Sequence, residues 1–131
     1  MPTIFSKIIN GELPGRIVWS DDQVAAFLTI APLTSGHTLV VPRAEIDEWT
    51  DLEPELLTRV MTVSHTIGAA LKRVFDAPRV GLVVAGFEVP HAHVHVFPAW
   101  EMAEFDFTRA NPNVSGDELD AHHKRILDAL G

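Results

Sequence analysis

Three of the seven histidines lie within five residues of one another, at His91, His93 and His95, separated by single apolar residues. In an extended strand alternate side chains share one face, about 6.6 Å apart along the chain. We therefore predict a strand from His91 to Phe97 that presents three imidazoles on one face. Neutral imidazole can act as a nucleophile, as a hydrogen-bond donor or as a metal ligand.

Three interpretations of this histidine cluster are open. The rings could lie on the surface of an edge strand. They could hold a catalytic metal, since imidazole is a ligand of zinc, iron and copper. In the third interpretation the middle histidine, His93, attacks phosphorus, which requires an acceptor for its far ring proton and donors around the phosphate. The flanking Val and Phe residues argue against an exposed edge strand, and Gly86 and Glu101 do not have the spacing of the cupin metal motif. The nucleophilic interpretation is therefore favoured.

The remaining chain indicates an α+β fold: a roughly five-stranded antiparallel sheet with one long helix, a C-terminal helix, and helices packed on one side. A capping-box spacing, Thr50 to Glu53, precedes the long helix, and a second one, Ser115 to Glu118, precedes the last helix. No clear signal covers residues 99 to 114. The expected elements are strands over 16–19, 23–30, 37–41, 79–85 (a buried strand) and 91–97, and helices over 54–75 and from Ser115 to about Leu130.

Composition narrows the functional class. The 131 residues suit one domain, and 47% of them are hydrophobic. The absence of cysteine excludes a disulfide framework and a thiolate metal site. A net charge of −8 argues against a nucleic-acid partner. No apolar run approaches the roughly 20 residues that span a bilayer, and the N-terminus does not resemble a signal peptide. We expect a cytoplasmic protein with a small-molecule ligand.

The segment from His91 to Phe97, written His-φ-His-φ-His-φ-φ with φ apolar, resembles the signature of the histidine-triad (HIT) family. Further blocks resemble that family in the same order. The resemblance covers about residues 3 to 98, and 99 to 131 would be a C-terminal extension of a single domain over 1–131. The blocks are Ile4–Pro14, Asp21–Phe27, Ile30–Pro32 and Gly36–Arg43.

The resemblance implies a nucleotide-binding hydrolase that releases a nucleoside monophosphate, AMP above other nucleotides, from its partner group. His93 would be the nucleophile on the α-phosphate and carry a covalent nucleotidyl intermediate. His95 would contact the phosphate and the leaving group, His91 would order the triad, and His37 would be a fourth histidine of the site. A purine nucleotide substrate and a homodimer are further expectations, and no metal is required.

The same resemblance predicts the substrate-binding residues and some departures from the family pattern. Leu13, Phe27 and Ile30 would wall the base and ribose pocket. Thr29 stands where the family commonly has an Asp that binds the ribose hydroxyls, and Phe87 stands where a Gln is common. Glu88 replaces a Ser of the phosphoramidase branch. Its carboxyl could act as a general acid or could point outward.

Zinc is a minor expectation. Some bacterial members hold a structural zinc, and the matching positions here are Thr3, Ser6, Glu45 and His91. Both thiolates are missing, so a tight site is not expected, although Glu45 and His91 could form a weaker one.

Two further functions stay open: a non-catalytic nucleotide-binding scaffold dimer, and a metal-binding protein or metal-dependent hydrolase that uses the three histidines. The leaving group is also open between an amine, a second nucleotide of a dinucleoside polyphosphate, and sulfate.

Overall fold

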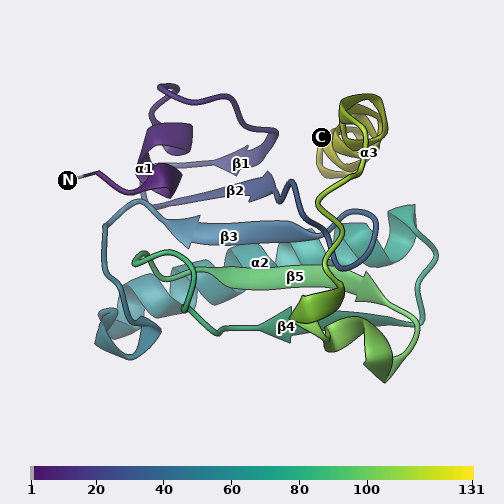
Figure 1. Cartoon of the computed structure of the whole chain (residues 1–131). Coiled ribbons are helices and arrows are strands. Elements are labelled where there is room, and N and C mark those ends of the chain that lie inside the picture. Colours follow the sequence, from purple (N-terminus) through teal and green to yellow (C-terminus); the bar gives the residue numbers. More distant parts are fainter. Residues whose placement is uncertain (1) are drawn as a thin grey trace.

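The computed structural model describes residues 2–131 and shows the expected α+β architecture (Figure 1). Five antiparallel strands form one sheet in the order β1-β2-β3-β5-β4. The α-helices are α1 (Ile4–Ile9), α2 (Pro54–Val74) and α3 (Gly116–Leu130). The strands are β1 (Ile17–Ser20), β2 (Val24–Leu28), β3 (Thr38–Pro42), β4 (Arg79–Val83) and β5 (Val94–Ala99).

The long helix α2 covers one face of the sheet. Pro54 occupies its first turn, where the missing N–H breaks no helical hydrogen bond. Val60, Val63, Ile67 and Leu71 recur at three- and four-residue steps and are buried. They form the main core with strand residues of the same face and with Ile126 of α3. None of the helices in residues 2–131 has the length and apolarity needed to cross a membrane.

The short helix α1 covers part of the opposite face, which the sequence analysis did not predict. Its residue Phe5 packs against Phe27 of β2 and against Leu39 and Val41 of β3. The two expected helices, α2 and α3, do share one core on the first face, and α1 is an additional helix on the other face. Six residues are too few to show a helical period, so Ile4–Ile9 looked only like an apolar start.

The last two strands also differ from the prediction, β5 in its bounds and β4 in its burial. Strand β5 begins at Val94 rather than at His91, because its first partner in β3 is Val40, opposite Val94. It continues through Pro98. Pairing with β3 ends at Val96, and Pro98 pairs only with Val80 of β4. The segment 79–85 was expected to be buried, but β4 is an edge strand with one neighbour, and its Leu82 is 44% exposed.

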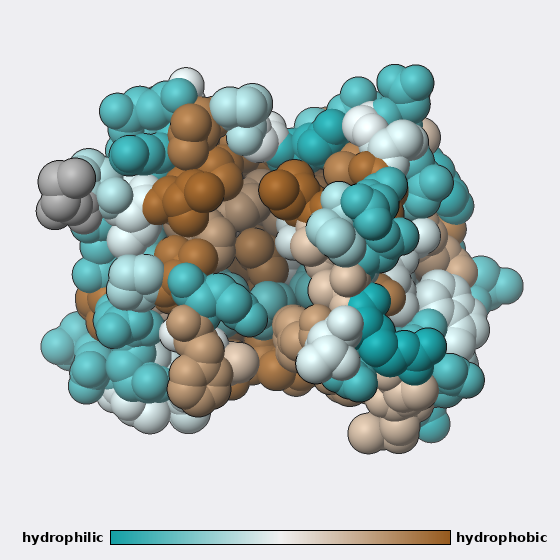
Figure 2. All heavy atoms as spheres, viewed as in Figure 1, coloured by the Kyte–Doolittle hydropathy of each residue, from teal (hydrophilic) through white to brown (hydrophobic). Residues whose placement is uncertain are grey.

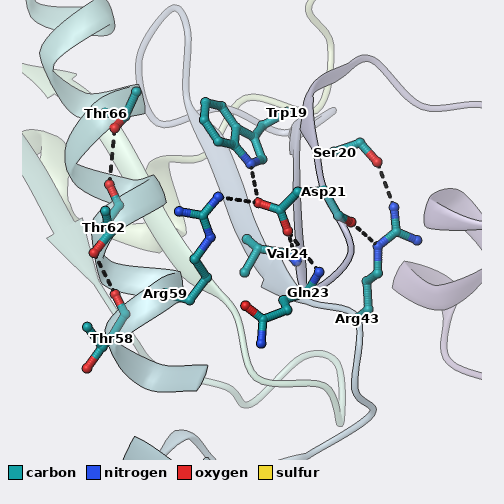
Figure 3. Close-up of polar contacts among 10 residues, drawn as sticks. All are labelled: Trp19, Ser20, Asp21, Gln23, Val24, Arg43, Thr58, Arg59, Thr62 and Thr66. Carbon is teal, nitrogen blue, oxygen red and sulfur yellow. Dashed lines mark hydrogen bonds and ion pairs between the residues drawn. The ribbon is translucent and has the colours of Figure 1, made fainter. Parts of the chain in front are cut away.

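The carboxylate of Asp21, in the turn between β1 and β2, ties this hairpin to α2 (Figure 3). It accepts hydrogen bonds from the Trp19 indole at 2.8 Å and from Arg59 of α2 at 2.7 Å. The backbone N–H groups of Gln23 and Val24 donate to its other oxygen. Desolvation alone would raise the pKa of Asp21, but these hydrogen bonds outweigh it and hold that pKa well below its ordinary value.

We expect Asp21→Asn to lower the free energy of unfolding by about 2 kcal/mol near neutral pH, because charge-assisted hydrogen bonds are lost. A folded-state pKa below the unfolded value of 3.8 means that this stabilisation is full above pH 3.8 and is lost as the pH falls through the folded-state pKa. The difference in the free energy of unfolding between wild type and variant, measured with urea, should therefore become smaller in acid. Asp22→Asn, an exposed neighbour, serves as the control. A difference in the free energy of unfolding that stays constant down to acid pH would contradict the stabilising role of the ionised Asp21 carboxylate.

Candidate functional site

A cleft of about 290 Å³ opens on the sheet face away from α2. It adjoins a second hollow of about 320 Å³ between α1 and β2, and the two share Phe5, Thr29 and Leu39. Figure 2 shows apolar side chains gathered around a hollow on this face. The cleft is lined by Phe5, Thr29, Ala31, His37, Leu39, Glu88, Val89, His93, His95, Phe107 and Ala110.

Three of the four expected catalytic histidines line this cleft. His95 lies in β5 opposite Leu39 of β3, and His93 immediately precedes β5. His37 immediately precedes β3 and follows Gly36, whose φ of +88° suits glycine. A side chain at Gly36 would also collide with the Phe75 ring. Both requirements fix the chain where His37 enters the site.

His91 does not line the cleft, although its ring packs against Phe5, as that of His93 does, with centroids 5.8 Å apart. It precedes β5 and is fully buried. Its Nε2 lies 2.7 Å from the carbonyl oxygen of Pro42, which can only accept, so Nε2 carries the proton. Its Nδ1 therefore accepts from the Thr3 hydroxyl at 2.7 Å. The sequence analysis considered Thr3 only as a position of a lost zinc ligand.

His93 has the opposite tautomer. Its Nδ1 lies 2.7 Å from the carbonyl oxygen of His91, an acceptor, so Nδ1 carries the proton. The Nε2 of a neutral His93 is then a bare lone pair, and it faces the cleft that this ring lines. The Phe5 ring packs edge-on against the imidazole, with centroids 4.9 Å apart, and helps to hold its orientation.

A second chain of hydrogen bonds sets the tautomer of His95. The backbone N–H of Leu33 donates to His37 Nδ1 at 2.9 Å, so the proton of a neutral His37 is on Nε2. That Nε2 donates to His95 Nδ1 at 3.0 Å. A neutral His95 then carries its proton on Nε2, which is buried and is the only buried side-chain nitrogen or oxygen in residues 2–131 without a hydrogen-bond partner. An unpaired buried donor is costly unless a ligand accepts from it.

Burial keeps the rings of His37, His91 and His95 neutral. Desolvation lowers the pKa of His37 to about 3, with smaller contributions from the positive charges that His95 and His93 would carry. Desolvation also lowers the pKa of His95 to about 4. The pKa of His91 is lowered by desolvation, which the bond to Pro42 and the charge of Glu45 offset in part. At neutral pH these three imidazoles hold one proton each.

The expected substrate residues divide between the two hollows. Leu13, Phe27 and Ile30 line the second hollow, and Ile30 is 72% exposed at its rim. Thr29 lines both, although its hydroxyl oxygen already accepts from the Ala31 N–H. Glu88 lines the histidine cleft, whereas Phe87 is 95% exposed.

Sequence reasoning missed the aromatic residues of the wall. Phe5 comes from α1, and Phe107, whose ring centroid lies 4.7 Å from that of His95, comes from the segment that gave no signal. No periodicity marks either residue, because both act through contacts with distant parts of the chain.

Glu88, His93 and His95 each offer one potential metal ligand within 4.8 Å of the others. The tautomers do not suit a cation, because the free His95 nitrogen carries a proton and has no lone pair to give. The weaker zinc site considered at Glu45 and His91 meets a similar obstacle. Both ring nitrogens of His91 are already engaged, by Thr3 and by Pro42.

Residues 10–102 match the model of the HIT domain. The chain belongs to the HIT family. An uncharacterised HIT-like protein of Borreliella burgdorferi is 42% identical over 82% of this chain and 83% of its own length. The adenosine 5′-monophosphoramidase of Saccharomyces cerevisiae is 29% identical over 97% of this chain and 82% of its own. A bis(5′-nucleosyl)-tetraphosphatase of Schizosaccharomyces pombe is 37% identical over 72% of this chain and 53% of its own.

Solved structures of HIT proteins share the fold. A HIT-like protein of Bartonella henselae superposes with a TM-score of 0.84 at 30% identity, covering 98% of this chain and 96% of its own. A zinc-bound histidine-triad protein of Mycobacterium smegmatis superposes with a TM-score of 0.81 at 25% identity, covering 97% and 91%. The predicted family and fold class are thereby confirmed.

The tautomers of this HIT protein can be measured directly. In long-range ¹H–¹⁵N spectra at pH 7 we expect His93 to be protonated on Nδ1 and His37, His91 and His95 on Nε2, for the hydrogen-bonding reasons above. Because burial holds the pKa of His37 at about 3 and that of His95 at about 4, both should stay neutral when the pH is lowered to 5. The exposed His65 serves as a reference ring on the same spectra. An Nε2 proton on His93 would refute the assignment.

Proposed function

We propose that this chain is a hydrolase that releases AMP from a substrate in which AMP is joined to a second group, through a covalent intermediate on His93. The observation that carries the proposal is the pairing of opposite tautomers in one cleft. The bare Nε2 of His93 stands beside the unpaired Nε2–H of His95, with ring centroids 4.9 Å apart. A nucleophile and an oxyanion donor side by side are what displacement at phosphorus requires.

The apolar hollow supports a nucleoside next to this pair. Leu13, Phe27 and Ile30 offer apolar surface to a flat base, and Thr29 lies where the hollow meets the histidine cleft. A nucleoside bound there would place its 5′-phosphate against His93. Thr29 offers the ribose one hydroxyl instead of a carboxylate, so its contribution to affinity is small.

In the first step the Nε2 lone pair of His93 forms a bond to the α-phosphorus. The bond from phosphorus to the partner group breaks, and its electron pair leaves with that group, which takes a proton from solvent. His95 Nε2–H donates to a phosphoryl oxygen, where negative charge builds up. The positive charge on the substituted His93 ring is stabilised by the carbonyl oxygen of His91, which accepts from Nδ1. Water then attacks phosphorus, loses a proton to solvent and frees AMP and His93.

The relatives support the hydrolase class. The yeast relative is an adenosine 5′-monophosphoramidase and the fission-yeast relative a bis(5′-nucleosyl)-tetraphosphatase. Both release a nucleotide by breaking a bond at phosphorus.

His93→Ala should lose at least about 1000-fold in kcat, since the covalent route needs this nitrogen. The measurement is AMP release from an adenosine phosphoramidate and from diadenosine tetraphosphate, with and without chelator, together with mass spectrometry of the protein for an adenylyl adduct. Retained AMP binding would show that the variant is folded. AMP binding by wild type without any turnover would favour the scaffold alternative. Activity that chelator removes and one metal restores would favour the metal alternative.

We also propose that the protein acts as a homodimer through the edge strand β4. A largely apolar hollow of about 400 Å³ lies beside it, and Trp49, Met61 and Leu82 in its wall are 42%, 39% and 44% exposed. An exposed edge strand next to an apolar hollow is a typical site of association. A second copy is the occupant we favour, because pairing two β4 edges about a two-fold axis would join the sheets, the arrangement that the family resemblance predicts.

Leu82→Glu should convert the dimer to a monomer, because it places a charge in the apolar contact on both sides of the two-fold axis. Leu127→Glu, on α3 and 40% exposed, is the matched control and should leave the dimer intact. Sedimentation equilibrium of both variants and of wild type decides the question. A monomeric wild type, or a dimeric Leu82→Glu, would overturn this interface.

A further inference from the structure

The loop between β4 and β5 places one carboxylate beside the nucleophile. Glu88 Oε2 lies 3.8 Å from His93 Nε2, and the Glu88 side chain is 59% exposed whereas that of His93 is 1% exposed. At this distance there is no hydrogen bond, and an ion pair would require a protonated His93. The carboxylate therefore stands at the mouth of the cleft, on the route by which the reacting phosphate and its partner group approach Nε2.

Among residues 2–131, no lysine or arginine forms an ion pair with this carboxylate. The described residues that line the histidine cleft include neither lysine nor arginine. Arg16, in the adjoining hollow, is already paired with Asp120 at 2.8 Å. The protein as a whole carries a net charge of −8. A substrate whose partner group is anionic meets repulsion here, and one whose partner group is cationic meets attraction.

We propose that Glu88 is a specificity-determining residue that selects substrates whose leaving group carries positive charge, such as amines with a second ammonium group, and rejects polyphosphate leaving groups. This inference rests on the proposed AMP-releasing function. Any atom bonded to a phosphorus in contact with His93 Nε2 lies within a few ångströms of Glu88. Opposite charges separated by about 5 Å at a partly exposed site change binding by roughly three- to tenfold.

The balance of the reaction fits such a leaving group. The P–N bond of the substrate breaks, its electron pair stays on the amine nitrogen, and that nitrogen takes a proton from solvent. A second ammonium group on the same amine does not react, and it can remain beside Glu88 throughout. A diphosphate or triphosphate leaving group, by contrast, gains negative charge close to the carboxylate while no lining cation compensates it.

The test uses three AMP phosphoramidates that differ in the charge at the end of the leaving amine: propylamine (neutral), 1,3-diaminopropane (cationic) and β-alanine (anionic). For wild type we expect kcat/KM to fall in the order cationic, neutral, anionic, with about tenfold between the extremes at low salt. In Glu88→Gln the ratio should fall close to one, and in Glu88→Lys the order should reverse. Glu55→Gln, an exposed residue of α2 that lines neither hollow, removes the same charge and should keep the wild-type ratio.

The outcomes separate this inference from the proposed function. Equal rates on all three substrates, or a ratio that Glu88→Gln leaves unchanged, would overturn the role of Glu88 while AMP release itself stands. A ratio lowered equally by Glu55→Gln would show that net charge, and not Glu88, sets the preference. Cleavage of diadenosine tetraphosphate with no AMP released from any of the three phosphoramidates would overturn this inference alone. Release of no AMP from any of the four substrates would overturn the proposed function and this inference with it.

Discussion

The hydrogen bond from His93 Nδ1 to the carbonyl oxygen of His91 decides which nitrogen faces the cleft. Were it absent, the ring could carry its proton on Nε2 and would have no lone pair to offer a phosphate. The bond needs a fixed backbone at His91, and that residue is held from two sides, by the carbonyl oxygen of Pro42 and by the hydroxyl of Thr3. The packing of α1 and the end of β3 thus serves the orientation of one ring.

Burial and tautomer act together on the other side of the cleft. Desolvation keeps His37 and His95 neutral, so each ring carries one proton on one of its two nitrogens. The backbone N–H of Leu33 donates to His37 Nδ1 and thereby determines which nitrogen carries the proton in both rings. The result is one unpaired donor, His95 Nε2–H, whereas the other buried side-chain nitrogens and oxygens of residues 2–131 all have hydrogen-bond partners. The energetic cost of that unpaired donor is what a phosphoryl oxygen would relieve, and for the same reason the nitrogen is a poor ligand for a cation.

Much of this arrangement could be predicted from the sequence. Val60, Val63, Ile67 and Leu71 predict the long helix by their spacing, and Ser115 predicts the start of the last one, where its side chain accepts from Glu118 N–H. The predictions that failed are those that depend on which strands pair and on where their pairing begins. The alternation rule placed His91 in the strand, but cross-strand partners begin at Val94. Likewise the Val and Leu residues of β4 suggested a buried strand, but composition does not reveal that this strand is the outermost one of the sheet.

The cluster around Thr3 shows how a metal-binding position can be replaced by hydrogen bonds. The Thr3 hydroxyl donates to His91 Nδ1 and accepts from the Ser6 N–H, while Glu45 accepts from the Thr3 N–H. These hydrogen bonds bring together the four positions at which the resemblance suggested a zinc site. The Thr3 hydroxyl fixes Nδ1 of His91 through a hydrogen bond, with no thiolate involved. Because the Pro42 carbonyl oxygen accepts from Nε2, the two hydrogen bonds together fix the ring of His91, the residue whose carbonyl oxygen sets the tautomer of His93.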